Sequence, residues 1–356
     1  MSNEFKIGTK KVGGDNPVFI IAEAGANHNG DLKLAKELAF QAKEIGCDCI
    51  KYQTFTAEEF CADPEQLFSY KSQGKEVTES MLDLFKRLEL KKNEWNELIS
   101  YCNEIGIHFM TTVQDPSNLE MLLEIGIDSI KVGSDDFDHI INLITYAKTG
   151  LPLIISRGMA DLAEIDTVIR KLEEHTDKII VLHCVSLYPT EPIDLNLKQI
   201  ERLKTIYPDI IWGFSDHSEG TLAPVLAACL GAKVIEKHFT LDHELPGPDH
   251  WFSMDIEQMK KIVSDIRLAE KMMGHSTVKI SDGEKNYKNI ARRRIVAKKD
   301  IDKGDFLSVE NISFKRCSNG IFVKEWDMVE GAVINKTIKK NNGINYVDIE
   351  FTSSQE

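Results

Sequence analysis

The sequence predicts a (β/α)8 barrel, an α/β fold, followed by a small β-rich domain. Short apolar runs that contain β-branched residues alternate with segments whose apolar residues recur at helical spacing. The first run, its helix and the next run together take about thirty residues, which is the length of a βαβ unit. Eight such runs in about 260 residues favour a closed barrel of buried parallel strands. After residue 275 the chain changes to short β-like runs broken by Gly and Asn.

The predicted barrel elements follow one another along the chain. The strands are expected at 18–25, 49–55, 108–114, 129–134, 152–158, 179–184, 210–217 and 233–240. A helix is expected over 31–46, because Asp31 can cap its first turn and Gly46 can end it. The remaining helices are expected at 117–125, 139–149, 161–175, 197–206, 221–230 and 255–273. The insert 56–107 carries additional helical pattern.

An open, doubly wound sheet is the alternative for alternating strands and helices. Such a sheet needs a glycine-rich phosphate loop after its first strand. The segment "EAGANHNG" has the wrong glycine spacing for that loop, so the barrel is favoured. The barrel domain is expected to span 1–275, a polar linker with a helical turn 276–294, and the β-rich domain 295–356. A domain of roughly sixty residues is marginal alone and is expected to lean on another surface.

Composition excludes several classes of function. The formal net charge of the 356 residues is −14, which argues against a nucleic-acid binder. No apolar run approaches the roughly 20 residues that a membrane-spanning helix needs, and the N-terminus has no apolar segment typical of a signal peptide. The seven cysteines include no C-x-x-C pair, which favours reduced cysteines and a cytoplasmic location. A local cluster of basic residues can still bind a small anion despite the global charge.

Polar side chains lie near the carboxyl end of every predicted strand. Catalytic residues of (β/α)8 barrels come from these strand ends. Burying one such group without a partner costs a few kcal/mol, so eight converging groups indicate one site rather than packing. The groups are Glu23, Lys51, Thr112, Lys131 with Ser134, Ser156 with Arg157, His183, Asp216 with His217, and Glu236 with His238.

Two histidines end the adjacent seventh and eighth predicted strands. A single histidine at a strand end is typically a structural residue, but His217 and His238 are expected to face the same barrel mouth. They therefore predict a shared divalent metal, and imidazole suits Zn, Mn, Fe or Co. Because only two protein ligands are evident, water or substrate would complete an open, catalytic site. His183 is interpreted as a hydrogen-bonding neighbour, with a third ligand as the alternative.

Two lysines lie inside otherwise apolar runs. Lys51 is flanked by Ile50 and Tyr52, and Lys131 by Ile130 and Val132, which a solvated lysine does not explain. Both are therefore predicted to bind an anion. Together with Thr112, Ser134 and Ser156 they could hold a phosphate and a carboxylate. The basic run 292–294 is interpreted as a solvated part of the linker.

The chain contains an ordered set of distinctive motifs, which are "FIIAEAGANHNGDLKLAKELAFQAKEIGCDCIKYQTF", "KVGSDD", "SRGM", "LHCVSLYPT", "GFSDHS", "EKHFTLDHELPGPDH" and "SFKRCSNGI". This set resembles the sialic acid synthases, which include the N-acetylneuraminate, legionaminate and pseudaminate synthases and related spore-coat polysaccharide proteins. The resemblance covers nearly the whole chain and implies a barrel followed by an antifreeze-like (SAF) domain. It implies a homodimer in which that domain covers the partner's barrel mouth. The implied reaction condenses phosphoenolpyruvate with an open-chain N-acylated amino sugar, either N-acetylmannosamine or a 2,4-diacetamido-trideoxyhexose, to give a nine-carbon 2-keto acid and phosphate.

The resemblance also implies roles for individual residues. The metal, usually manganese, is assigned to His217 and His238, and Glu23 matches the acid near the metal and the sugar. Tyr188 and Asp249 match positions in the sugar site. Arg316 matches the arginine that the small domain sends to the sugar acyl group in the partner's barrel. The phosphoenolpyruvate pocket is assigned to Lys51, Thr112, Lys131, Ser134 and Ser156.

The chain departs from the family pattern at three positions. Asp136 stands where Glu is typical, and Ser186 where the neuraminate enzymes have Asn, so the exact sugar stays open. Arg157 replaces the usual Thr and is expected to add positive charge near the anion pocket. Glu23 and Asp136 are both candidates to position the attacking water or to carry protons, and the sequence does not divide these roles.

Three other functions are compatible with parts of the pattern. A metal-dependent aldolase on the same barrel would use the histidines but would need no second anion pocket. A synthase of the same family could take a 6-phosphorylated sugar, although no extra phosphate clamp is evident near the sugar positions. A non-catalytic carbohydrate-binding protein would not need both metal ligands together with both lysines, and this chain keeps all four.

Overall fold

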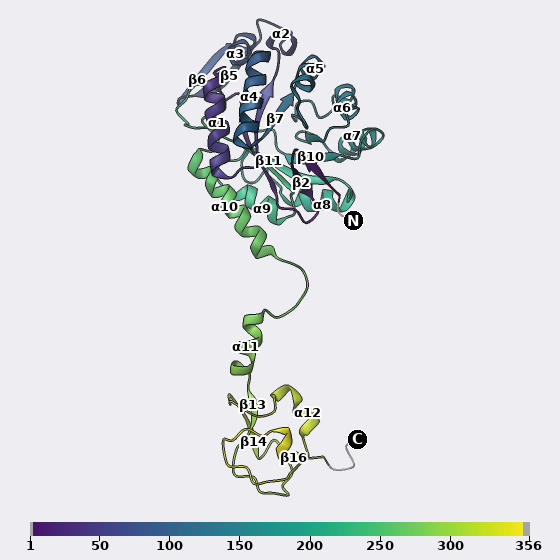
Figure 1. The fold of residues 1–356 in the computed structure, drawn as a ribbon, viewed down its shortest axis with the longest axis vertical. Coiled ribbons are helices and arrows are strands. Elements are labelled where there is room, and N and C mark those ends of the chain that lie inside the picture. The colour runs from purple at the N-terminus through teal and green to yellow at the C-terminus, as the bar shows by residue number, and fades with distance from the viewer. Residues whose placement is uncertain (1–2, 352–356) are drawn as a thin grey trace. The chain divides into compact units, whose positions relative to one another are not determined.

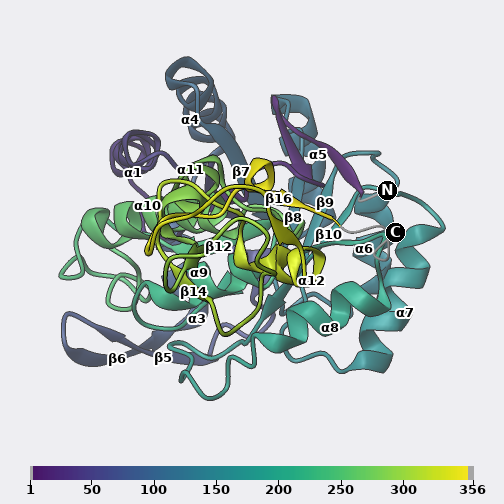
Figure 2. The same cartoon turned by 90° about the horizontal axis from the view of Figure 1, so that it is seen from below.

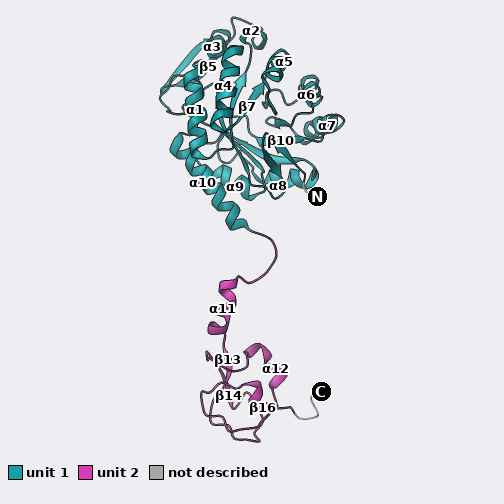
Figure 3. Cartoon of the chain, in the orientation of Figure 1, with its two compact units in different colours: residues 1–274 teal, residues 275–356 magenta. Residues whose placement is uncertain are grey.

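The computed structural model describes residues 3–351. These residues form two compact units that divide after residue 274, and Figure 3 shows the two units in different colours. The first unit contains a closed barrel of eight parallel strands, which confirms the predicted fold class. Within residues 3–351 no helix combines the length and the apolar character that crossing a membrane requires.

The barrel strands follow the chain order, so each strand pairs with its neighbours in sequence among the eight. Parallel strands that are joined by helices place all their carboxyl ends at one mouth. The strands are β3 (Phe19–Gly25), β4 (Cys49–Thr54), β7 (His108–Val113), β8 (Ile130–Val132), β9 (Leu153–Ser156), β10 (Ile179–Cys184), β11 (Ile211–Asp216) and β12 (Val234–His238).

Helices surround the barrel, as Figures 1 and 2 show. The first of them begins after Asp31, whose side chain accepts from the Lys33 amide, and ends at Gly46 in the left-handed conformation, as the sequence predicted. The outer helices are α1 (Leu32–Ile45), α4 (Lys92–Ile105), α5 (Pro116–Ile125), α6 (Ile140–Ala147), α7 (Leu162–Glu173), α8 (Lys198–Ile206), α9 (Leu222–Cys229) and α10 (Ile256–Met273).

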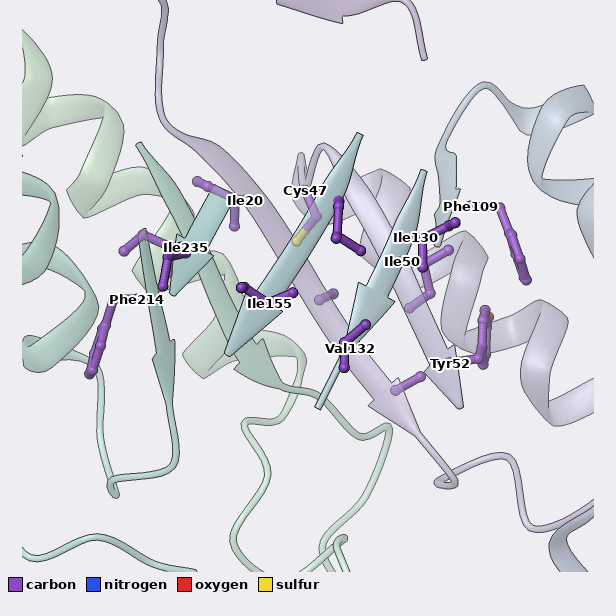
Figure 4. Close-up of a cluster of buried hydrophobic side chains, with 14 of the residues drawn as sticks. Ile20, Cys47, Ile50, Tyr52, Phe109, Ile130, Val132, Ile155, Phe214 and Ile235 are labelled. Carbon is purple, nitrogen blue, oxygen red and sulfur yellow. The ribbon is translucent and has the colours of Figure 1, made fainter. Parts of the chain in front are cut away.

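Side chains alternate between the two faces of the barrel wall, except at an irregularity in the pairing of β3 with β4 between Glu23 and Gly25. In β4, Ile50 and Tyr52 belong to the main core between strands and helices, which Figure 4 shows, whereas Cys49 belongs to a separate cluster inside the barrel. Because side chains alternate with a period of two, Lys51 and Gln53 point to the interior with Cys49. The apolar interior residues, such as Phe19 and Cys49, lie at or near the amino ends of their strands. The carboxyl ends are therefore left for polar side chains.

Two hairpins were not predicted. The first joins β1 (Glu4–Ile7) to β2 (Lys10–Gly13), and its Ile7 and Val12 are buried in the interior cluster at the amino ends of the strands. Runs of four residues with mixed polarity carry too little periodicity to be recognised.

The second hairpin lies in the insert between β4 and β7, where only helical pattern was expected. It joins β5 (Leu67–Ser72) to β6 (Lys75–Ser80) through Gln73 and Gly74, which both have positive φ. This is the backbone that a tight two-residue hairpin turn requires. The insert also contains the short helices α2 (Ala57–Phe60) and α3 (Met81–Leu88). Figure 1 shows β5, β6 and α3 together at one end of the barrel.

The second unit has its own small core, built mainly from isoleucine side chains such as Ile295, Ile312 and Ile334. The segment expected as a linker contains a full helix, α11 (Asp282–Ala291), which begins at Ser281 with a capping box and buries none of its residues. The other elements are short: β13 (Arg294–Ala297), β14 (Ile312–Lys315), a 3-10 turn at Val323–Glu325, α12 (Trp326–Val329), β15 (Val333–Ile334), a 3-10 turn at Tyr346–Asp348 and β16 (Ile349–Glu350).

Candidate active site

A cavity of about 540 Å³ opens at the carboxyl ends of the barrel strands. It gathers ten of the twelve residues to which the sequence analysis assigned a catalytic, substrate-binding or metal-binding role, and the exceptions are Asp136 and Arg316. Asp216, which was expected to converge on the same site, does not line the cavity and pairs with Lys237 instead. The ten that line it are Glu23, Lys51, Thr112, Lys131, Ser134, Ser156, Tyr188, His217, His238 and Asp249.

Glu23 and Lys51 form a buried ion pair on neighbouring strands. Lys51 Nζ lies 2.7 Å from Glu23 Oε1 and donates to Thr112 Oγ1 at 3.0 Å. Burial raises the pKa of Glu23 to about 7, against the opposing effect of Lys51. Burial alone would lower the pKa of Lys51, but Glu23 raises it above its ordinary value. Lys51 is therefore a firmly charged cation, while Glu23 can gain or lose a proton near neutral pH.

Lys131 forms the centre of a second polar group. Its Nζ donates to Ser156 Oγ at 2.8 Å and to the Val132 carbonyl at 2.9 Å. Glu236 Oε1 lies 3.7 Å from Lys131 Nζ, and Glu236 Oε2 lies 3.7 Å from Lys51 Nζ. Burial works to raise the pKa of Glu236, but Lys131 and then Lys51 outweigh it and lower that pKa. The two lysines therefore share one carboxylate, and each also holds a hydroxyl group.

Several cavity residues were given no role by the sequence analysis. Gln53 Nε2 donates to Glu23 Oε1 at 3.3 Å, and Ser215 Oγ donates to Glu236 Oε1 at 2.8 Å. Gln53 lies two residues after Lys51 on β4, and Ser215 lies two residues before His217, which directly follows β11. The period-two rule could therefore have found both. Ser134 and Ser186 hydroxyls lie 2.7 Å apart at the cavity wall.

The two histidines lie side by side, with ring centroids 5.5 Å apart. His217 Nδ1 lies 2.8 Å from the Val185 carbonyl, which fixes its proton on that nitrogen and leaves Nε2 as an acceptor. His238 Nδ1 is buried without a hydrogen-bond partner. Burial lowers the pKa of His217 to about 4 and holds the pKa of His238 well below its ordinary value, so both rings are neutral at neutral pH.

This pair fits a divalent metal. Neutral imidazoles are good ligands for such ions, and a buried nitrogen without a partner is costly unless something binds it. Within residues 3–351 no group of three or more His, Cys, Asp or Glu side chains is arranged around a common metal position. The assignment of a metal to His217 and His238 therefore stays a prediction, in which water or substrate would supply the other ligands.

Tyr188 and Asp249 border the histidines. The Tyr188 ring stacks on His217 with centroids 4.1 Å apart, and Asp249 Oδ2 lies 3.7 Å from His238 Nδ1. Burial raises the pKa of Asp249 to about 6. A Cβ built at Gly25 would lie 3.4 to 3.6 Å from Glu23 Oε1, Asp249 Oδ2 and Gln53 Nε2. Polar groups from three chain segments therefore converge at this point of the cavity.

Asp136 does not line the cavity, whereas its neighbour Asp135 does. Asp136 is half-buried, and burial followed by the charge of Asp135 raises its pKa to about 6. Both residues follow β8 in a loop, where no regular period tells which side chain turns inward. Of these two adjacent acids, Asp135 is the one that lines the cavity.

Arg157 turns away from the cavity, contrary to the expected charge near the anion pocket. Its guanidinium bonds to His183 Nδ1 and to Gln199 Oε1 of α8, which places it between the strands and the helices. Because Ser156 faces the interior, strand alternation directs the next side chain outward. His183 Nε2 lies 2.7 Å from the Leu195 carbonyl, so His183 is a hydrogen-bonding neighbour outside the cavity lining.

Arg316 belongs to the second unit. It lies just after β14, and its Nε donates to the Ala291 carbonyl at the end of α11 at 3.2 Å. The side chain is exposed within its unit and pairs with no carboxylate among the described residues. It is therefore available to a second surface.

Comparisons with known proteins agree with the fold and the cavity. Residues 38–278 match the NeuB family, and residues 292–350 match the SAF domain. The chain is 37% identical to N,N'-diacetyllegionaminic acid synthase of Legionella pneumophila, over 98% of this chain and 99% of that protein. It is 35% identical to N-acetylneuraminate-9-phosphate synthase of Homo sapiens, over 85% of this chain and 84% of that protein.

A solved structure of N-acetylneuraminic acid (sialic acid) synthetase from Leptospira borgpetersenii, in complex with citrate, is also similar. It superposes with a TM-score of 0.73 at 37% identity, over 82% of this chain and 98% of that chain. The chain has a closed barrel whose cavity, at the carboxyl ends of the strands, is lined by ionisable side chains. This architecture is that of a (β/α)8-barrel enzyme. The chain belongs to the NeuB family of acid synthases and carries a SAF domain, which confirms the resemblance seen in its motifs.

Proposed function

We propose that this enzyme condenses phosphoenolpyruvate with an open-chain N-acylated amino sugar, releasing phosphate and a nine-carbon 2-keto acid. The observation that carries the proposal is the presence of two buried lysines and two neutral histidines in one cavity. The lysines suit a small polyanion, and the histidines suit a metal beside an aldehyde. The names of the relatives, acid synthases for legionaminic and neuraminic acids, support the same chemistry.

Phosphoenolpyruvate would bind over Lys51 and Lys131. Without substrate each lysine is balanced by a carboxylate, with Glu236 between them and Glu23 beside Lys51. Glu23 is poised to take up a proton, so an incoming anion would meet an excess of positive charge. The hydroxyls of Thr112 and Ser156, which already accept bonds from the lysines, can turn to donate to phosphate or carboxylate oxygens. Ser134 lines the same cavity and would add a third hydroxyl.

The reaction then needs one carbon–carbon bond and one water. C3 of phosphoenolpyruvate attacks the aldehyde carbon, and the aldehyde oxygen takes a proton to become a hydroxyl. Water adds to C2 and gives up one proton, and the resulting hemiketal phosphate collapses to the ketone. The C–O bond to phosphate breaks in this step, so phosphate leaves with the bridging oxygen.

The cavity residues divide into groups that serve these steps. A divalent metal held by His217 and His238, for which we propose Mn²⁺, would polarise the aldehyde as a Lewis acid. Glu23, with its pKa near 7 and its position beside Gln53 and Asp249, is the proposed group that exchanges a proton. Tyr188 and Asp249 would orient the sugar. Asp136 does not line the cavity, so a role for it would be indirect.

We further propose that the active enzyme is a cytoplasmic homodimer. Arg316 of one subunit would bind the sugar acyl oxygen in the partner's barrel, because a planar guanidinium suits a fixed carbonyl. Its available side chain and the small core of the second unit support this arrangement.

The direct test of this function is phosphate release from phosphoenolpyruvate with Mn²⁺ and a panel of acylated hexosamines. We expect release that depends on both the acceptor and the metal. Release without an acceptor, or none with any N-acylated amino sugar under metal-replete conditions, would contradict the proposal.

Replacing Lys131 by methionine should raise the KM for phosphoenolpyruvate about tenfold or more. The change removes a buried cation whose charge-assisted bonds are each worth about 1.5–3 kcal/mol. Initial rates over a range of phosphoenolpyruvate concentrations measure the effect. Arg157→Met is the matched control, because it removes a buried cation that faces away from the cavity, and it should leave this KM within about twofold. Equal effects of the two variants would show that the lysine acts on folding rather than on the anion.

A further inference from the structure

One wall of the cavity is apolar and takes no part in the condensation chemistry described above. It comes from the insert between β4 and β7, namely from α2, the β5–β6 hairpin and α3. We call it the insert wall. The residues that line the cavity from it and have apolar or aromatic side chains are Phe60, Phe68, Tyr70, Leu84, Phe85 and Leu88.

The insert wall is a packed structure rather than a loose loop. Phe85 meets Phe55 and Phe60 edge-on with ring centroids 4.9 and 4.8 Å apart. Phe68 stacks on Tyr70 at 5.8 Å. Tyr70 already donates its hydroxyl to Glu79 at 2.6 Å, so it is committed within the hairpin. The wall therefore offers the cavity mainly carbon surface.

The hairpin is attached to the loop that carries Asp249. Gln73 Nε2 donates to the Glu244 carbonyl at 2.9 Å, and the Gly247 amide donates to Ser72 Oγ at 3.1 Å. Lys71 Nζ lies 4.5 Å from the centre of the Trp251 ring, a cation–π contact. These contacts hold the insert wall beside Asp249 and Phe252, at the side of the cavity where the sugar is proposed to bind.

The insert offers the cavity one cation, Lys71, which lies over the Trp251 ring, whereas the two cations of α3 are paired with acids. Arg87 makes two bonds to Glu79 at 2.8 and 2.9 Å, and Lys86 pairs with Glu58 at 2.8 Å. Among the described residues that line the cavity there is no arginine, and Lys71 is the only lysine besides Lys51 and Lys131. A phosphate on the sugar would face the acids Asp135 and Asp249 and the carbon surface of the insert wall. Lys71 would be its single cation, in place of the paired donors that bind phosphate well.

We infer that the insert wall selects an acceptor sugar whose end remote from the aldehyde is uncharged and apolar. The chemical class is a 6-deoxy sugar with acylamido groups, such as a 2,4-diacetamido-trideoxyhexose, rather than a sugar with a free or phosphorylated 6-hydroxyl group. This inference rests on the proposed function and decides between acceptors that it leaves open. A methyl group in place of a hydroxymethyl group against such a wall is worth about tenfold in kcat/KM.

The test compares 2,4-diacetamido-2,4,6-trideoxymannose, N-acetylmannosamine and N-acetylmannosamine 6-phosphate with saturating phosphoenolpyruvate and Mn²⁺. We expect kcat/KM for the trideoxy sugar to exceed that for N-acetylmannosamine by about tenfold or more, and the 6-phosphate to be about 100-fold poorer still. Equal or better use of the 6-phosphate would overturn the inference. Binding of the three corresponding alditols, measured by calorimetry, reports the same order without turnover. If no acceptor releases phosphate while the alditols keep this order, the proposed function fails and the inference about the wall stands.

Variants of β5 separate this role from folding. Phe68→Ser should reduce the preference for the trideoxy sugar over N-acetylmannosamine at least fivefold and leave the KM for phosphoenolpyruvate unchanged, whereas Phe68→Leu should keep the preference. Leu67→Ser is the matched control, because Leu67 is 66% exposed and lies outside the cavity lining. If Phe68→Ser folds and keeps the preference for the trideoxy sugar, the insert wall does not select the acceptor. The same conclusion follows if Leu67→Ser changes this preference as much as Phe68→Ser does. If Phe68→Ser fails to fold, a change of preference in Phe68→Leu overturns the inference, and an unchanged preference supports it.

Discussion

Replacing His217 by alanine is expected to lower kcat for condensation by about a thousandfold or more while the protein stays folded. The change deletes one of two proposed protein ligands of the metal, so the site loses half of its donors. The fold should persist because the ring makes one hydrogen bond to the protein backbone, to the Val185 carbonyl, and stands at the cavity rather than in the apolar core. Phosphate release, thermal unfolding and the metal content of the purified protein measure the three consequences.

His175→Ala is the matched control for this experiment, because His175 is exposed after α7 and lies outside the cavity lining. It should leave activity and metal content unchanged. Near wild-type turnover by His217→Ala after treatment with a chelator would refute the assignment of the metal to this residue.

Replacing Arg316 by alanine is expected to lower kcat/KM for the amino sugar by about a hundredfold and to leave the KM for phosphoenolpyruvate nearly unchanged. The guanidinium is proposed to bind only the acyl group of the sugar, and truncating a charged group in a binding site costs about 2–5 kcal/mol. Lys303→Ala, which removes another exposed cation of the second unit, should have no effect. Steady-state kinetics in each substrate measure the difference.

Mixing the two inactive variants tests whether this arginine serves the partner's barrel. After subunit exchange, a heterodimer of Arg316→Ala and His217→Ala chains should regain part of the activity. One of its composite sites would have both residues and the other would have neither. No recovery after proven exchange would show that each small domain serves its own barrel.

The barrel could be predicted because its strands are buried on both faces. Ile20, Ile50 and Ile155 pack against the helices while their neighbours fill the interior, so each strand forms an apolar run that the sequence displays. The β5–β6 hairpin was missed for the opposite reason. Leu67 and several other residues of its strands are exposed, so no apolar pattern marks them. The small second unit has strands of only two to four residues, too short for any period.

The cavity could be predicted where an ionisable residue interrupts an apolar run, as Lys51 and Lys131 do. Such residues are conspicuous because burying a charge is costly. Ser215 and Gln53 were not assigned because small or neutral polar residues are common on strands for other reasons. Arg157 was placed wrongly because only its distance along the chain was considered, whereas the alternation from Ser156 directs it to the helix layer.

The alternation of side chains along a strand could not be used in the loop after β8. Asp135 and Asp136 are adjacent acids beyond the last strand residue, Val132, where the backbone has no repeating geometry. Which of them lines the cavity depends on the turn itself. The insert wall could not be predicted from the sequence either, because its aromatic residues come together from three short elements that are separate in the sequence.

We propose that this enzyme joins phosphoenolpyruvate to an amino sugar and releases the phosphate by C–O cleavage. Phosphoenolpyruvate labelled with ¹⁸O at the bridging oxygen distinguishes this reaction from an aldol addition, with pyruvate as the parallel donor. We expect one labelled phosphate for each nine-carbon 2-keto acid formed, and no product from pyruvate. Formation of the nine-carbon acid from pyruvate without phosphate release would contradict it and identify an aldolase on the same barrel.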